Sequence, residues 1–155
     1  MLRRLVLLLL AFTLPPVTMG AAPDTVNLHN GYVTVVNNVR FTDVKGNEPF
    51  ALRVHLSRDT GIGLATHWAD DVWPGQQAII NNCCILAGTR YVLGCNAKDK
   101  PINVCATLND VWPRLCNERG IPFGYAAFEI TGEIWFDVGW KSSGLTLRRI
   151  DTGCP

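Results

Sequence analysis

The sequence predicts a mainly β protein: a small, disulfide-stabilised β-sandwich or barrel with one short helix. Three observations support this prediction. Short runs of alternating apolar and polar residues recur along the chain, six cysteines follow an N-terminal secretory signal, and 155 residues suit one domain. A composition of 48% hydrophobic and 17% charged residues argues against intrinsic disorder. A formal net charge of +1 offers no basic surface for nucleic acid.

The N-terminus is expected to be a cleaved signal peptide over residues 1–21. Arg3 and Arg4 precede an apolar run over residues 5–14, and small residues follow at 20–22, an order typical of secretory signals. The apolar run of about ten residues is too short to span a bilayer, which needs about 20. We therefore expect a secreted, extracellular protein with a single β-rich domain over residues 22–155 and no membrane span after cleavage.

All six cysteines lie in this expected domain. An even number of cysteines in an oxidising compartment predicts three disulfides. The adjacent Cys83 and Cys84 are not expected to bond each other, because such a bridge would be strained, and the connectivity is otherwise open. The alternative is zinc, but the spacing contains no C-x2-C pair and no nearby histidine, so we predict no metal and no cofactor. The cysteines are Cys83, Cys84, Cys95, Cys105, Cys116 and Cys154.

Most of the strand predictions rest on two-residue alternation. In residues 51–57, Leu52, Val54 and Leu56 face one way and polar side chains face the other. The C-terminal third is predicted to be a meander of three strands, with turns at residues 131–132 and 142–144. Strands are expected over residues 32–36, 51–57, 77–80, 89–95, 125–130, 133–138 and 145–150.

One segment has helical spacing instead. Its apolar residues are three, four and seven positions apart, Asn109 or Asp110 can cap its start, and Gly120 can end it. Pro113 is tolerated only in the first turn. Cys105 and Cys116 flank the segment and are expected to link it to the sheets. The apolar positions are Leu108, Val111, Trp112 and Leu115.

A catalytic site is the first of two functional possibilities. His55 lies on the polar face of a predicted strand, and His67 and three aspartates follow it closely. Histidine beside carboxylates can support acid–base hydrolysis. We favour the simpler interpretation that these are exposed strand and loop residues, because no known catalytic motif is present. The aspartates are Asp59, Asp70 and Asp71.

A binding surface is the second possibility. Residues 58–75 are predicted to form a loop in which Trp68 and Trp73 flank Asp70 and Asp71. Aromatic anchors surrounded by polar groups are typical of binding surfaces. Trp135 is placed by alternation among acidic residues of the meander, which also favours a contact role. The alternative for all three tryptophans is that they fill the core.

Several short stretches are similar to the plant self-incompatibility protein S1 family. They are residues 33–38, residues 52–63, Pro74-Gly75-Gln76, residues 88–95 and Trp135-Phe136-Asp137. The chain departs from the family pattern at Leu56, where the family has a cysteine, and lacks its late C-x2-C-x-W element. The resemblance implies a secreted β-sandwich ligand of a cell-surface receptor without catalysis, and it assigns no site residue.

These expectations combine into one functional hypothesis with two rivals. The first is a secreted, non-enzymatic recognition protein, such as a signalling ligand, effector or defence protein. Its partner would be a cell-surface or extracellular protein or a glycan. One rival is a small secreted hydrolase that uses His55 or His67 with a nearby aspartate. The other is a secreted inhibitor of a foreign hydrolase.

Overall fold

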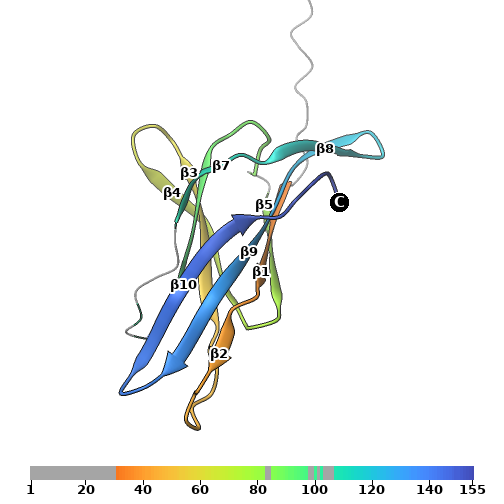
Figure 1. Ribbon diagram of the computed structural model, residues 1–155. Coiled ribbons are helices and arrows are strands. Elements are labelled where there is room, and N and C mark those ends of the chain that lie inside the picture. Colours follow the sequence, from red (N-terminus) through yellow and green to blue (C-terminus); the bar gives the residue numbers. More distant parts are fainter. Residues whose placement is uncertain (1–30, 83–84, 98–99, 101, 103–106) are drawn as a thin grey trace, which may run out of the picture.

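The chain folds into two β-sheets (Figure 1). The computed structural model describes residues 31–82, 85–97, 100, 102 and 107–155. The predicted signal peptide and Cys83, Cys84 and Cys105 lie outside the described residues. Within those residues the protein has ten strands and no helix, so the prediction of a mainly β fold is confirmed.

The larger sheet has six strands, and β9 is paired with four of them. The strand order is β10–β9–β1–β5, while β2 and β8 also pair with β9. β1 runs parallel to β9 and antiparallel to β5. The strands are β1 (Gly31–Asn37), β2 (Arg40–Thr42), β5 (Gln77–Asn82), β8 (Arg114–Glu118), β9 (Ile121–Phe136) and β10 (Trp140–Arg149).

The smaller sheet is antiparallel and has the order β4–β3–β6–β7. Its central strand β3 confirms the alternation predicted for it, because Leu52, Val54 and Leu56 are buried while Arg53 and His55 are only partly buried. Its strands are β3 (Leu52–Asp59), β4 (Leu64–Val72), β6 (Tyr91–Asn96) and β7 (Leu108–Val111).

One hydrophobic core joins the two sheets. Val33 and Val35 of β1 and Phe128 of β9 belong to the same buried cluster as Val54 and Leu93 of the smaller sheet. Both sheets stay open over the described residues. The arrangement is therefore that of a sandwich rather than a closed barrel.

The predicted helix at residues 108–115 is wrong. β7 and β8 occupy this region, with Pro113 between them, and their backbone groups pair with β6 and β9. Val111 is buried, but Trp112 and Leu115 are exposed, so the apolar positions do not form one helical face. Gly120 ends no helix. With Arg119 it forms a two-residue hairpin turn in which both φ angles are positive, as a type I′ turn requires.

The predicted three-strand meander is also wrong in its first turn. β9 runs through Thr131 and Gly132 without a reversal, and the chain turns back at residues 137–139 instead. Gly132 has a different role. A Cβ atom there would lie 2.7 Å from the Gly144 carbonyl oxygen, so glycine allows the close approach of β10 where the β9–β10 register shifts. Ser142 and Ser143 accordingly lie within β10.

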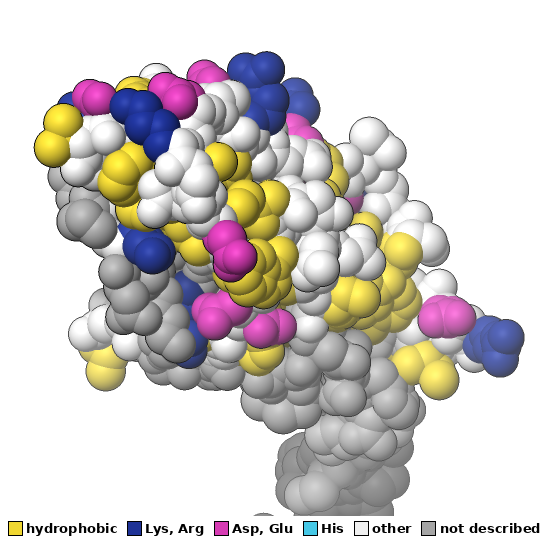
Figure 2. All heavy atoms as spheres, turned by 90° about the horizontal axis from the view of Figure 1, so that it is seen from below, with side chains coloured by type: hydrophobic (Ala, Val, Ile, Leu, Met, Phe, Trp, Pro, Cys, Tyr) yellow, Lys and Arg dark blue, Asp and Glu magenta, His cyan; other side chains and the backbone are white. Residues whose placement is uncertain are grey.

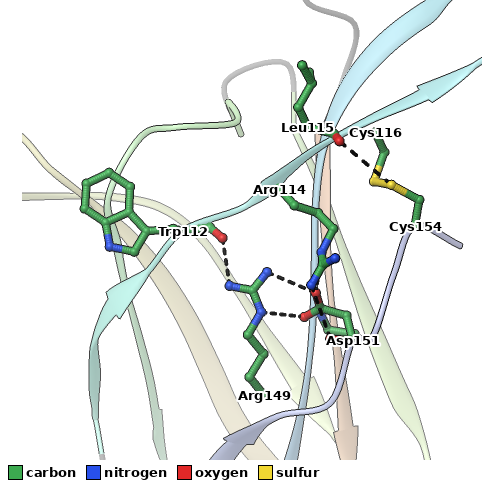
Figure 3. A network of polar contacts seen from close by, with 8 residues as sticks. Trp112, Arg114, Leu115, Cys116, Arg149, Asp151 and Cys154 are labelled. Carbon is green, nitrogen blue, oxygen red and sulfur yellow. Dashed lines mark hydrogen bonds and ion pairs between the residues drawn. A yellow bond between two sulfur atoms is a disulfide. The ribbon is translucent and has the colours of Figure 1, made fainter.

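The C-terminal segment is fastened to the larger sheet by a disulfide and a buried carboxylate (Figure 3). Cys154 is bonded to Cys116 of β8, with 5.7 Å between the Cα atoms. The Asp151 side chain has no exposed surface, and its carboxylate accepts hydrogen bonds from Arg149 Nε (2.7 Å), Arg114 Nε (2.8 Å) and the Ala127 N–H (3.0 Å). Burial alone would raise the pKa of Asp151, but these hydrogen bonds lower it, so the carboxylate is ionised.

The disulfide prediction is confirmed for the described cysteines. Besides the Cys116–Cys154 bridge, Cys95 of β6 is disulfide-bonded. Cys116 therefore attaches the C-terminus to β8 and does not link a helix to the sheets.

Candidate functional site

The loop predicted over residues 58–75 is largely a strand. β4 fills half of it, β3 continues to Asp59, and residues 60–63 form the β3–β4 hairpin turn. Two-residue alternation did not reveal β4, because an extra residue of β4 lies opposite Leu56 and Ser57 and shifts the register there. Only residues 73–76, between β4 and β5, remain as a connection.

This connection is a tight turn that presents Trp73. The Gln76 N–H donates to the Trp73 carbonyl oxygen at 3.0 Å, Pro74 occupies the second position, and Gly75 has a φ of 75°. Proline followed by a residue of positive φ is the pattern of a type II turn. Trp73 at the first position is 50% exposed.

Trp73 borders a shallow hollow of about 420 Å³ at the lower end of the sandwich in Figure 1. The hollow lies between this turn and the β2–β3 loop, and we call it the Trp73 hollow. The indole and two proline rings supply apolar surface, while an exposed carboxylate and an exposed amide supply hydrogen-bonding groups. Seen from below, hydrophobic side chains gather in the middle of this end with acidic side chains beside them (Figure 2). The lining residues are Glu48, Pro49, Trp73, Pro74 and Gln76.

Asn37 holds the turn in place from inside the protein. It is completely buried at the end of β1, and its Nδ2 donates to the Val72 carbonyl oxygen at 2.8 Å. Its backbone N–H donates to the Gln76 carbonyl oxygen at 2.9 Å, and its carbonyl oxygen accepts from the Gly75 N–H at 2.7 Å. Hydrogen bonds therefore hold both ends of the turn, so the backbone that presents Trp73 is fixed before any partner binds.

The β2–β3 loop on the other side of the hollow is anchored by aromatic rings. Phe50, next to Pro49, is buried and meets Phe41 and Trp140 edge to face, with ring centroids 5.1 and 4.9 Å apart. Edge-to-face pairs are a favoured arrangement of buried aromatic rings. Both walls of the hollow are thus attached to the core.

Replacing Asn37 with alanine is expected to lower the free energy of unfolding by about 2–4 kcal/mol. In the original protein, Asn37 Oδ1 accepts a hydrogen bond from the Val39 N–H at 3.1 Å, and Asn37 Nδ2 donates to the Val72 carbonyl oxygen. Alanine leaves both of these backbone groups without a partner. Each buried polar group left unsatisfied costs about 1–3 kcal/mol. Urea unfolding measures the loss. Asn38→Ala is the matched control. Asn38 is exposed, and the Glu129 carboxylate to which its Nδ2 donates at 3.1 Å keeps its hydrogen bond from Arg148, so the cost should stay below about 1 kcal/mol. Equal losses at the two positions would contradict the role given to Asn37.

Of the predicted binding residues, only Trp73 lines the hollow. Trp68 lies in β4 opposite Leu56, is half-buried and packs against the hydrophobic core. Trp135 lies in β9 between Thr42 and Lys141 and is half-buried. The structure therefore does not bring the three tryptophans together.

Asp70 and Asp71 do not form a carboxylate pair. Adjacent residues of a strand point to opposite faces of the sheet, and β4 places Asp71 opposite Arg53 and Asp70 opposite Val54. Asp71 Oδ1 lies 3.4 Å from Arg53 Nη1. Asp70 is exposed and accepts a hydrogen bond from the Asp71 N–H at 2.8 Å.

The residues proposed for hydrolysis are spread over the smaller sheet. The imidazole of His55 lies across Gly94, where a Cβ atom would come 2.4 Å from Nε2. Burial, and to a smaller extent Arg53, lower the pKa of His55, so its ring is neutral at neutral pH. Asp59 forms an ion pair with Arg90 and accepts a hydrogen bond from the Gly61 N–H, and these contacts lower its pKa. No hydrogen bond or ion pair joins His55 to an aspartate in the described part of the chain, and the side chain of His67 lies outside that part.

No family model, curated protein or solved structure matches the chain. Among the described residues, no group of three histidine, cysteine or acidic side chains is placed to hold a metal ion. The same residues include no helix long and apolar enough to cross a membrane.

Sequence reasoning missed most of the hollow. Glu48 and Pro49 lie about 25 positions before Trp73, and only the fold places all three around the same hollow. Asn37 directly follows the strand expected over residues 32–36, and nothing in the sequence marks it as a support for the turn. A tryptophan followed by Pro-Gly was the available signal, because this dipeptide marks a tight turn and so favours exposure of the residue before it.

Proposed function

We propose that this protein is a secreted, non-enzymatic recognition protein that binds an extracellular protein or glycan through the Trp73 hollow. The observation that carries the proposal is a half-exposed tryptophan at a rigid turn, beside two prolines and two hydrogen-bonding side chains. Binding surfaces concentrate their energy in a few aromatic anchors surrounded by polar groups. Because Asn37 fixes the turn, little ordering is needed on binding.

The similarity to the S1 family favours a cell-surface receptor as the partner. A ligand of this kind acts by shape and chemistry at one surface and needs no reacting group. A secreted inhibitor would use the same surface, and its partner would then be a hydrolase that loses activity when bound.

Capture of partners from the extracellular fluid of the source organism, together with a glycan array, tests the proposal. Trp73→Ala is expected to weaken binding by about 2 kcal/mol or more, the loss typical of a central anchor. Trp112→Ala is the matched control, because Trp112 is 46% exposed but does not line the hollow. If the Trp73 variant binds the same partners as tightly as the unaltered protein, the proposal is wrong.

A further inference from the structure

Within the described part of the chain, β5 is an edge strand without the usual protection of an edge. It pairs with β1 on one side, and no described strand pairs with its other side. None of its residues, Gln77–Asn82, is charged, and Ile79 is 53% exposed. An edge strand presents a row of free N–H and C=O groups that can pair with another chain, and proteins normally block this with charges, bulges or short strands.

The other sheet edges in the described structure carry such protection. β4 has Asp70, Asp71 and a register shift. β10 has three basic residues and a register shift, and β7 is short and contains Asp110. β2 and β8, which pair only with β9, are short and contain charged residues. Among these six strands, β5 is the one suited to accept a further strand.

A carboxylate without an ion pair to a described lysine or arginine lies on β4, three residues before Trp73 and the turn that leads into β5. β4 contacts β5, and the Trp73 turn connects the two strands. Trp68 and Val72 of β4 both pack toward the core. Every second residue of a strand faces the same side, so Asp70, which lies between these two, also faces the larger sheet. No ion pair joins Asp70 to a lysine or arginine in the described part of the chain. A strand added next to β5 would run past this carboxylate.

We propose that the β5 edge binds an extended segment of a partner protein that adds to the sheet as a further strand. The segment carries lysine or arginine on the face toward Asp70 and an apolar side chain beside Ile79. One of its ends lies near Trp73, because the Trp73 turn leads directly into Gln77. Main-chain hydrogen bonds supply affinity in this mode, and alternate side chains supply specificity. The inference rests on the proposed function and narrows its partner from a protein or glycan to a basic, extended protein segment.

Charge argues against a second copy of this chain at the same edge. If two copies paired through β5, their β4 strands would approach each other beside the joint and bring two Asp70 carboxylates together. Like charges placed side by side disfavour such a contact. A basic segment has the opposite effect, so charge complementarity selects it.

The test uses a short synthetic peptide in which lysine and valine alternate, with binding measured by calorimetry and by amide shifts of β5 at low salt. Two control peptides carry glutamate in place of lysine, or N-methyl groups that block strand pairing. The lysine peptide alone is expected to bind. Asp70→Asn and Ile79→Lys should each weaken its binding by about tenfold or more. The side chains replaced are exposed, so both variants should keep the melting temperature of the unaltered protein.

Asp110→Asn and Ile62→Lys are the matched controls. Asp110 is an exposed carboxylate on the opposite edge of the smaller sheet, and Ile62 is fully exposed at the β3–β4 turn. Neither change should affect binding. The proposal is overturned if the peptide does not bind, if the glutamate peptide binds as tightly, or if the two test variants bind like the controls. It is also overturned if sedimentation shows a dimer that Ile79→Lys dissociates. Should any of these occur while partner capture still depends on Trp73, the proposed function stands and only the β5 inference fails.

Discussion

Replacing Cys154 with serine is expected to lower the melting temperature by roughly 10 °C, a loss of about 3–4 kcal/mol. The Cys116–Cys154 bridge closes a loop with a sequence separation of 38 residues, and a loop of this length restricts the unfolded chain strongly. Cys154 is exposed, so serine there adds no buried polar group. The loss therefore reports the bridge itself.

The double variant Cys116→Ala, Cys154→Ser provides the control for this experiment, with alanine at position 116 because Cys116 is buried. It removes the free thiol that the single variant leaves at Cys116, because a free thiol can exchange with other disulfides. Both variants should melt at similar temperatures in a calorimetric scan. The hydrogen bonds of Asp151 still hold the C-terminal segment, so the variants should fold. A melting temperature unchanged from that of the original protein would show that the bridge contributes no stability.

The second large effect is on stability, and it distinguishes Trp68 from Trp73, for which the sequence allows the same two interpretations. Trp68→Ala is expected to cost about 2–3 kcal/mol of unfolding free energy, somewhat less than the roughly 3–5 kcal/mol for a fully buried tryptophan. Trp68 is half-buried and packs against the core, so its removal leaves unfilled space. Trp73→Ala is expected to change stability by less than about 0.5 kcal/mol, because half of the Trp73 side chain is exposed at a turn held by backbone hydrogen bonds.

Urea unfolding of both variants measures the difference. A large loss at Trp73 would mean that its ring supports the fold and would weaken its assignment as a binding anchor. No loss at Trp68 would contradict its packing against the core. The two substitutions are chemically identical, so each variant serves as the control for the other.

Strand alternation was predictable where one face of a strand is buried along its whole length. In β3, the side chains of Leu52, Val54 and Leu56 must leave water together, and the polar residues between them then face outward. The same reasoning failed in β4. There a single extra residue shifts the register, so the alternation breaks while the strand continues.

The helix prediction failed because an apolar spacing of three and four residues does not specify a structure in a short segment. Leu108 and Val111 belong to one sheet, and Leu115 belongs to the other. Pro113 has no N–H to donate and separates the two strands. The backbone is satisfied by strand pairing instead. β7 pairs with β6, which lies earlier in the sequence, and β8 pairs with β9, which follows it.

The sequence by itself determined the mainly β class of this protein and the use of its described cysteines in disulfides. The secretory start stays a prediction. These properties depend on composition and on the order of neighbouring residues. Only the tertiary structure decided which residues form the candidate site. Asn37 binds Val72 across the fold, and Glu48 lines the same hollow as Trp73. The adjacent Asp70 and Asp71 separate onto opposite faces of one strand. The reason is physical. Alternation along a strand is local, whereas burial and edge exposure depend on which strands pair, and that pairing is set by the packing of the whole core.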